Sequence, residues 1–366
     1  MDAEAVLAAR LSTQRLTGPP AASAVEAVRE LLCVQAQDAP LAQAMIALRA
    51  GTTVAAVQRA VATGEIVRTH VLRPTWHYVA AEDLTWLLEL TSPKVESGMA
   101  ARHRLLGLDP ARVSAGLDVI ADALGGRNYL TRTEVGAVLT ETGLLTAEDG
   151  LFGQQVGHLL LLGELRGLLC SAPDERPEHR YALVSEVIGR QPAAGRSDAV
   201  AALVGRFVAG HGPVALADLQ RWAKVTLTEA RAALAGLGDR VARVRVGEDD
   251  LWHAPDAVRP EARPTRALLL STFDEAFLSY RKVPWPRSPH HPAGDDPYRF
   301  AEAGGGVVLC DLADVGSWKR TLTRSGVNLS LKVDASLSRT ARAAIEEASQ
   351  RLVDAIETNG SVAPGS

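Results

Sequence analysis

The chain has 366 residues, of which 47% are hydrophobic and 22% charged; these are ordinary globular values that exclude a disordered chain. The 39 Lys and Arg residues against 43 Asp and Glu residues give a formal net charge of −4, so nucleic-acid binding would depend on local basic patches. Three widely spaced cysteines, no run of eighteen apolar residues and no apolar signal segment lead us to expect no disulfide framework, no membrane partner and a cytoplasmic protein.

The first predicted unit, residues 1–125, begins with a capped helix. Ser23 and Glu26 form a capping pattern that opens the helical segment VEAVRELLCV, and two more helical segments follow. In the segment IVRTHVLRPTWHYVA, apolar and polar residues then alternate on both sides of Arg73 and Pro74, which predicts a hairpin. A helical extension with a proline break follows from residue 101.

Two later stretches, residues 126–195 and 196–258, repeat this order of helix, helix and hairpin. Capping pairs open helices at Thr131 and at Thr226, and short alternating segments follow in each stretch. Two helices joined by a tight turn and followed by a two-stranded wing make a winged helix. The sequence therefore predicts three tandem winged helix-turn-helix units, with three unrelated α+β pieces as the alternative.

Residues 259–366 are predicted to form a C-terminal α+β region. Strand patterns surround a Pro- and His-rich loop at 281–298, and apolar spacing predicts a long closing helix from residue 338. His290 and His291 are expected at the surface, because no histidine spacing typical of a metal site occurs. The expected fold is α+β, predominantly helical, with no metal and no other cofactor.

Basic residues in the predicted hairpins are candidates for DNA contacts. Arg243 and Arg245 lie two apart on one strand and therefore on one face of the wing, which suits phosphate or minor-groove contacts. An ordinary solvated face is the alternative. The full set of candidate DNA-binding residues is Arg68, Arg73, Arg243, Arg245, Lys319 and Arg320.

Two glutamines that flank Ala36 stand apart from this pattern. If the helix from Ser23 ends near Val34, Gln35 and Gln37 lie on extended backbone and point to the same side. In a continuing helix they would diverge by about 200°. Spacing alone also allows two ordinary polar residues in a connection between helices.

The segment VQAQDAPLAQAMIALR resembles the Q-Φ-Q signature, where Φ is aliphatic, of the AlkZ-like winged-helix DNA glycosylases. That family includes azinomycin-resistance glycosylases that unhook interstrand crosslinks. The similarity covers most of the chain and continues through the segments THVLRPTWHYV, YLTRTEV, DLQRWAKV, LLSTFDEAFLSY and VGSW.

The resemblance implies excision of N7- and N3-alkylated purines from double-stranded DNA, including crosslinked purines. Gln35 and Gln37 correspond to the catalytic pair. A sister branch has Asp at the third motif position, so Gln37 places this chain with the resistance-type branch. The loop 281–298 departs from the family's less proline-rich pattern.

Amides suit this chemistry, because a cationic purine needs no strong general acid and a Gln oxygen can orient a water. Asp38 is a rival base, although we expect it to cap a helix from Leu41. His70 and His77 are secondary candidates. No lysine lies near the motif in the sequence, so we expect a monofunctional enzyme. We also expect it to be monomeric and nucleoid-associated.

Two other classes of function remain open from the sequence. A non-catalytic winged-helix regulator would prefer a specific operator and release no base. A scaffold for protein contacts would show little salt-dependent affinity for DNA.

Overall fold

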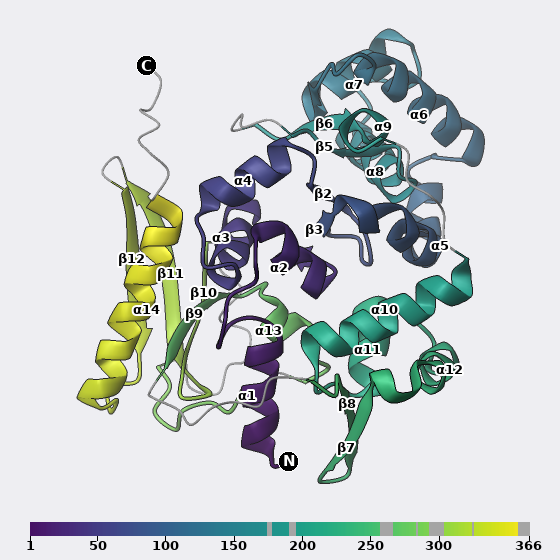
Figure 1. Ribbon diagram of the computed structural model, residues 1–366. Helices are drawn as coiled ribbons and strands as arrows, with labels where there is room; N and C mark the ends of the chain where they lie inside the picture. The colour runs from purple at the N-terminus through teal and green to yellow at the C-terminus, as the bar shows by residue number, and fades with distance from the viewer. Residues whose placement is uncertain are drawn as a thin grey trace. The chain divides into compact units, whose positions relative to one another are not determined.

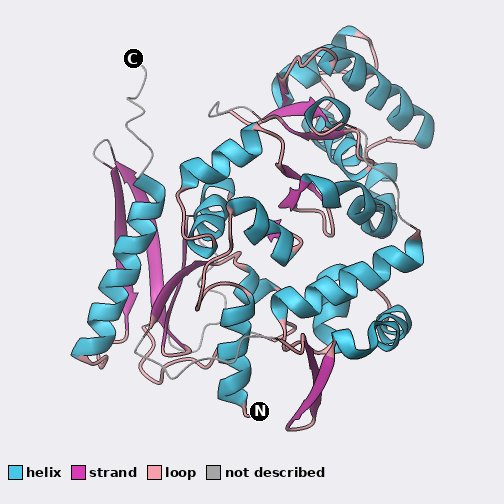
Figure 2. Ribbon diagram, in the orientation of Figure 1, coloured by secondary structure: helices cyan, strands magenta, loops and turns pink. Residues whose placement is uncertain are grey.

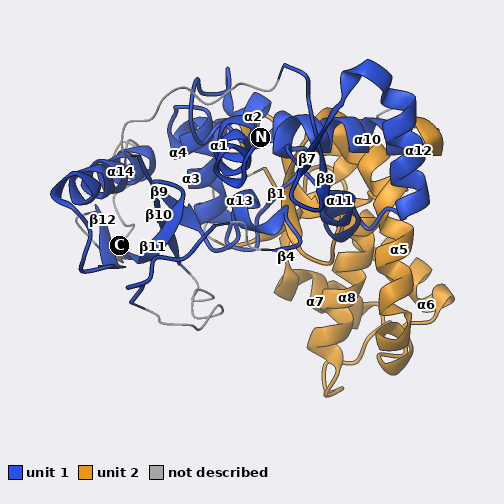
Figure 3. Ribbon diagram, turned by 90° about the horizontal axis from the view of Figure 1, so that it is seen from below, with its two compact units in different colours: residues 1–59, 200–366 blue, residues 60–199 orange. Residues whose placement is uncertain are grey.

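The computed structural model describes residues 1–173, 178–189, 195–256, 266–282, 285–292, 304–323 and 326–357. The chain divides into two compact units (Figure 3): unit 1 comprises Met1–Arg59 and Val200–Ser366, and unit 2 comprises Ala60–Ala199. Helices predominate and the strands form small antiparallel sheets (Figure 2), which confirms the predicted α+β class. The four-part domain division and the winged-helix assignment stay predictions.

The N-terminal part of unit 1 is a run of short helices with side-chain caps. Ser23 Oγ accepts a hydrogen bond from Glu26 N at 3.1 Å, as predicted, and the helix ends at Leu31 because Leu32 adopts a φ of +65°. The elements are α1 (Ala3–Thr13), α2 (Ala24–Leu31), β1 (Val34–Gln35), α3 (Ala39–Arg49) and α4 (Val54–Ala62), of which α4 runs on into unit 2.

The next part of unit 1 has the predicted order of helices and a hairpin. Thr226 and Glu229 form the expected capping box, and Gly247, with a φ of +59°, lies in the turn between the two hairpin strands. The elements are α10 (Arg196–His211), α11 (Leu216–Ala223), α12 (Leu227–Leu237), a short 3₁₀ turn η2 (Gly238–Arg240), β7 (Ala242–Val246) and β8 (Asp249–His253).

A four-stranded antiparallel sheet completes unit 1, with the strand order β12-β11-β10-β9. The long helix α14 (Arg339–Glu357) runs along this sheet (Figure 1) and buries Ile345 and Leu352. Between β9 and β10 the chain forms the short helix α13, which begins at Glu275. The elements are β9 (Ala267–Ser271), α13 (Glu275–Leu278), β10 (Gly305–Cys310), β11 (Ala313–Thr323) and β12 (Gly326–Val333).

The Pro- and His-rich loop differs in one respect from expectation. His290 is exposed, but His291 is buried, with its Nε2 3.0 Å from Asp314 Oδ1. The expected surface position is therefore wrong for His291. A carboxylate partner on β11 makes burial of this polar ring acceptable. Residues 283–284 and 293–298 of the loop lie outside the described residues.

Unit 2 is built on an apolar helical core. Its centre is formed by residues such as Leu124, Leu139 and Leu159, all fully buried. The strands β4, β6 and β5 form one small sheet, and β2 pairs with β3 as the predicted hairpin. The elements are β2 (Ile66–His70), β3 (Trp76–Ala80), η1 (Ala81–Asp83), α5 (Leu84–Leu105), α6 (Pro110–Leu124), β4 (Leu130–Thr131), α7 (Arg132–Glu141), α8 (Phe152–Leu165), β5 (Leu169–Ser171), β6 (Arg180–Leu183) and α9 (Val184–Val187).

In the described part of the chain, no single helix has the length and apolar character to cross a membrane. One pair of helices, α3 and α4, passes by length and composition only when taken together, and the pair is bent by 109°.

Helix α10 approaches α2 closely at Gly210, where an added Cβ would lie 2.1 Å from the Glu30 carbonyl oxygen. Gly210→Ala should therefore force the backbones apart and lower the free energy of unfolding by about 1–3 kcal/mol. Gly236, near the end of α12, has open space around its Cβ position. Gly236→Ala should instead stabilise the protein, by about 0.4–1 kcal/mol. Urea unfolding measures the free energy of unfolding of both variants. Equal changes in this free energy would contradict the close packing of α10 on α2.

Candidate active site

The two motif glutamines follow directly on the end of α2. Gln35 lies in β1 and is half-buried, Ala36 is 0% exposed, and Gln37 is exposed in a bend. This alternation of burial agrees with a backbone that turns Ala36 inward and both amides to the other side. The helix ends three residues earlier than the sequence suggests, which leaves room for the extended segment that the motif requires.

Asp38 begins the next helix. Its Oδ1 accepts a hydrogen bond from Leu41 N at 3.1 Å, which confirms the predicted N-cap, although α3 begins two residues earlier, at Ala39. Arg320 Nη2 from β11 lies 3.8 Å from the same oxygen, and the two side chains are only 11% and 18% exposed. The Asp38 carboxylate is therefore already engaged by a backbone amide and a guanidinium.

Glu275 on α13 is a buried residue of unit 1 that contacts the backbone of the motif. Its Oε1 accepts a hydrogen bond from Gln35 N at 3.2 Å. Its Oε2 accepts from Trp222 Nε1 at 2.9 Å and lies 2.9 Å from Ser279 Oγ. Glu275 is 1% exposed, so these contacts replace the water that a carboxylate would otherwise keep. No sequence pattern identifies Glu275 as a site residue, although it lies within the family-like segment LLSTFDEAFLSY.

A wider set of buried polar side chains surrounds Glu275. Arg49 makes a bidentate pair with Asp274 at 2.7 and 2.8 Å, and Arg49 Nη2 donates to Gln14 Oε1 at 3.2 Å. Gln14 Nε2 donates to Tyr280 Oη at 2.9 Å, and burial raises the pKa of the Tyr280 hydroxyl above its usual value. We call this set the polar cluster; its members are Gln14, Arg49, His211, Trp222, Asp274, Glu275, Ser279 and Tyr280.

The polar cluster joins segments that are far apart in the chain. Tyr280 Oη, two residues beyond the end of α13, donates to His211 O at the end of α10 at 2.9 Å. Burial lowers the pKa of His211 to about 3, so its ring is neutral at physiological pH. Because the members come from several helices and are bonded to one another, the position of Glu275 depends on several distant segments of unit 1.

The candidate DNA-binding residues of unit 1 differ in accessibility. Arg243 and Arg245 project from β7 with 65% and 61% of their side chains exposed, and both lie near Asp250, at 3.7 and 3.3 Å. Such surface ion pairs are weak and leave guanidinium groups available for phosphates. Lys319 is exposed on β11, whereas its neighbour Arg320 is mostly buried beside Asp38.

The four candidates of unit 2 lie in and beside the β2–β3 hairpin. His77 is 0% exposed, and burial together with Arg73 holds its pKa well below the ordinary value. Its Nδ1 lies 2.8 Å from Thr75 O and its Nε2 lies 3.0 Å from Arg73 Nη2, so both ring nitrogens have partners within unit 2. A secondary catalytic role of His77 has no support in this arrangement.

His70 and Arg68 belong to a second buried group in unit 2. His70 Nδ1 and Trp76 Nε1 both contact the carboxylate of Glu164, which is 1% exposed. The Arg68 guanidinium stacks 4.5 Å above the Trp76 ring, and desolvation lowers the pKa of Arg68. Trp76 therefore serves packing and hydrogen bonding within unit 2.

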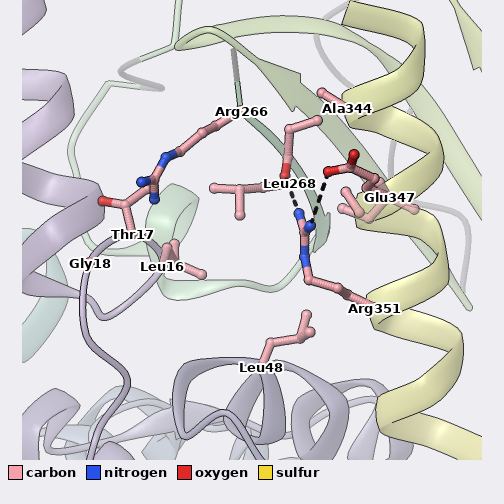
Figure 4. A pocket seen from close by; sticks show the side chains of 12 residues that line it. Leu16, Thr17, Gly18, Leu48, Arg266, Leu268, Ala344, Glu347 and Arg351 are labelled. Atoms are coloured by element: carbon pink, nitrogen blue, oxygen red, sulfur yellow. Dashed lines mark hydrogen bonds and ion pairs between the residues drawn. The ribbon is translucent and has the colours of Figure 1, made fainter. Parts of the chain in front are cut away.

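Unit 1 also contains a pocket of about 400 Å³ beside β9 and α14 (Figure 4). Arg351 lies at its edge, where Nη2 donates to Ala267 O at 3.2 Å and Nη1 lies 4.0 Å from Glu347. None of the candidate site residues is among those that line this pocket. Over the described ranges, no group of three or more His, Cys, Asp or Glu side chains could hold a metal ion.

Comparisons with known proteins show the family to which the chain belongs. The family model "DNA glycosylase AlkZ-like" matches residues 28–355, so the chain belongs to the AlkZ-like DNA glycosylases, enzymes that hydrolyse N-glycosidic bonds in DNA. The structure of Streptomyces sahachiroi DNA glycosylase AlkZ is similar, with a TM-score of 0.76, 22% identity and coverage of 97% of this chain and 96% of that one. At this identity the likeness shows a shared fold.

A second solved structure, the DIP2311 protein of Corynebacterium diphtheriae, aligns over 58% of this chain and 39% of that one at 14% identity, with a TM-score of 0.16. No curated protein matches the chain significantly.

Substitutions at Asp38 distinguish its role as the N-cap of α3 from a role as general base in catalysis. Asp38→Asn keeps a cap acceptor but loses the charge that faces Arg320, so it should leave base release nearly unchanged and destabilise less than Asp38→Ala, which should cost about 1 kcal/mol of unfolding free energy or more. Thermal unfolding and a single-turnover excision assay measure the two effects. Loss of base release in a stably folded Asp38→Asn variant would instead identify Asp38 as the base.

Proposed function

We propose that this DNA glycosylase excises cationic N7- and N3-alkylated purines, with Gln35 and Gln37 orienting the attacking water. The observation that carries the proposal is the arrangement of the motif. Two amides flank a fully buried Ala36, and the first is held at its backbone by Glu275. A rigidly held pair of neutral acceptors is suited to orienting a water against a sugar carbon.

The reaction needs little acid catalysis. Alkylation at N7 gives the purine a positive charge, so the base can leave without a proton from the enzyme. Its departure leaves an oxocarbenium-like sugar, which the oxygen dipoles of two amides stabilise while they orient water. Neither amide can form a Schiff base, so the proposed enzyme is monofunctional and leaves an abasic site.

Duplex DNA would be held by exposed cations outside the motif. Arg243 and Arg245 on β7 and Lys319 on β11 are accessible for phosphates. Each phosphate contact adds affinity that salt weakens, and the overall charge of −4 adds no long-range attraction. We propose Arg68, Arg73 and Arg320 as weaker candidates, because each has close partners within its own unit.

Gln37 at the third motif position supports a finer proposal. We propose that the enzyme also unhooks interstrand crosslinks joined through purine N7, in repair or in self-resistance to DNA-alkylating natural products. Because the amide pair acts on the glycosidic bond, a large adduct on the base need not change the chemistry. We further propose a monomer that acts at the nucleoid in the cytoplasm.

The direct test uses duplex DNA that contains one N7-methylguanine. Wild-type protein should release the free base and leave an abasic site, while Gln35→Ala and Gln37→Ala should each lower the single-turnover rate roughly tenfold or more. Gln58→Ala is a matched control, since Gln58 is also half-buried in unit 1 but lies on α4. Full activity in both motif variants would remove the proposed mechanism.

The same assay with an azinomycin-type crosslink tests the finer proposal. Conversion of the crosslinked duplex to separated strands supports unhooking, whereas release of methylpurine alone contradicts it. A transcription regulator, the alternative, would protect a specific sequence in footprinting and release no base from either substrate.

A further inference from the structure

The backbone N–H of Gln35 donates to a side chain from a distant part of the chain. Gln35 belongs to a strand of only two residues, which follows the left-handed residue Leu32. Glu275 Oε1 accepts its N–H at 3.2 Å across 240 positions of sequence. A bond to the main chain of the motif fixes the direction in which the side chains of Gln35 and its neighbours project.

Glu275 itself cannot move easily. Trp222 Nε1 donates to its Oε2, and Trp222 is 0% exposed. The preceding residue, Asp274, caps α13 by accepting from Ala276 N at 2.8 Å and is clamped by Arg49. The Glu275 carboxylate is therefore held in one position, from which it accepts the N–H of Gln35.

The protons of the polar cluster show which substitute Glu275 can accept. Leu31 O, His211, Ser279 and Glu275 make three successive contacts, of 3.1, 2.9 and 2.9 Å, and each contact requires one proton. Neutral His211 and the Ser279 hydroxyl bring two protons, so the three contacts lack a third. A glutamine at position 275 would supply that proton from its NH₂ group while its oxygen still faces Gln35 N.

We propose that Glu275 is the positioning residue of the reaction, which acts through the Gln35 backbone and touches neither the base nor the water. The proposal rests on the proposed function of Gln35 and Gln37. In this view the Glu275–Gln35 bond keeps both amides in the orientation that holds water. Its loss lowers the rate of the chemical step and leaves DNA affinity unchanged, because the exposed cations that bind phosphate lie elsewhere.

The test compares variants in a Trp222→Phe background. In the single variant Glu275→Gln the NH₂ group would face an N–H donor in either orientation, that of Gln35 or that of Trp222; removing the indole N–H relieves this conflict. E275Q/W222F should keep the single-turnover rate within roughly threefold of W222F. E275A/W222F should lose roughly tenfold or more, with the half-saturating DNA concentration unchanged.

Leu352→Ala, in the core of α14, controls for lost stability away from the motif. The assay is run on full-length protein below the unfolding temperature of every variant. Equal rates for E275Q/W222F and E275A/W222F, or a loss as large in Leu352→Ala at matched stability, would overturn the proposal.

Hydrogen exchange at the Gln35 amide gives a readout that does not need activity. Exchange should be roughly tenfold faster in E275A/W222F than in E275Q/W222F, because only the alanine variant lacks an acceptor for that N–H. Failure of wild-type protein to release any base would refute the proposed function. Hydrogen exchange at the Gln35 amide would still test the Glu275–Gln35 hydrogen bond. Normal base release combined with equal exchange in the two variants would refute the positioning role alone.

Discussion

The hydrogen bond from Gln35 N to Glu275 Oε1 joins an accessible motif to the buried polar cluster of unit 1. The positioning of the two motif amides that we propose depends on this hydrogen bond. Amides are weak bases, so their value lies in orientation, and orientation is lost if the backbone that carries them moves. Helix α2 ends at Leu31 and Asp38 caps α3. Glu275 accepts a hydrogen bond from Gln35 N in the segment between the two helices. The motif is thus fixed at both ends and in the middle.

The residues proposed for chemistry and those proposed for DNA binding are of different kinds. The residues around the motif are neutral amides or ions with close partners, such as Asp38 beside Arg320. The exposed cations that we propose for DNA contacts are Arg243 and Arg245 on β7 and Lys319 on β11. A chain with a net charge of −4 can bind duplex DNA through such local groups, while the neutral motif gains no attraction for phosphate that would compete with correct placement of the sugar.

Local features of the fold could be predicted from the sequence, and long-range ones could not. The caps at Ser23, Thr131 and Asp38 depend on residues three positions away, so their patterns are visible in the chain. Helix α5 was missed because Pro93 interrupts its pattern. The polar cluster was missed because its partners are separated by up to 266 positions, as in Gln14 and Tyr280. Burial of His291 likewise depends on Asp314, on another strand.

The most direct test of the central claim is a crystal structure with DNA that carries a cationic azasugar in place of the damaged nucleotide. The account predicts one water beside the ring nitrogen, within hydrogen-bonding distance of the side-chain oxygens of both Gln35 and Gln37, with Glu275 still bonded to Gln35 N. A structure in which either amide points away from the sugar, or in which a carboxylate holds the water instead, would contradict it.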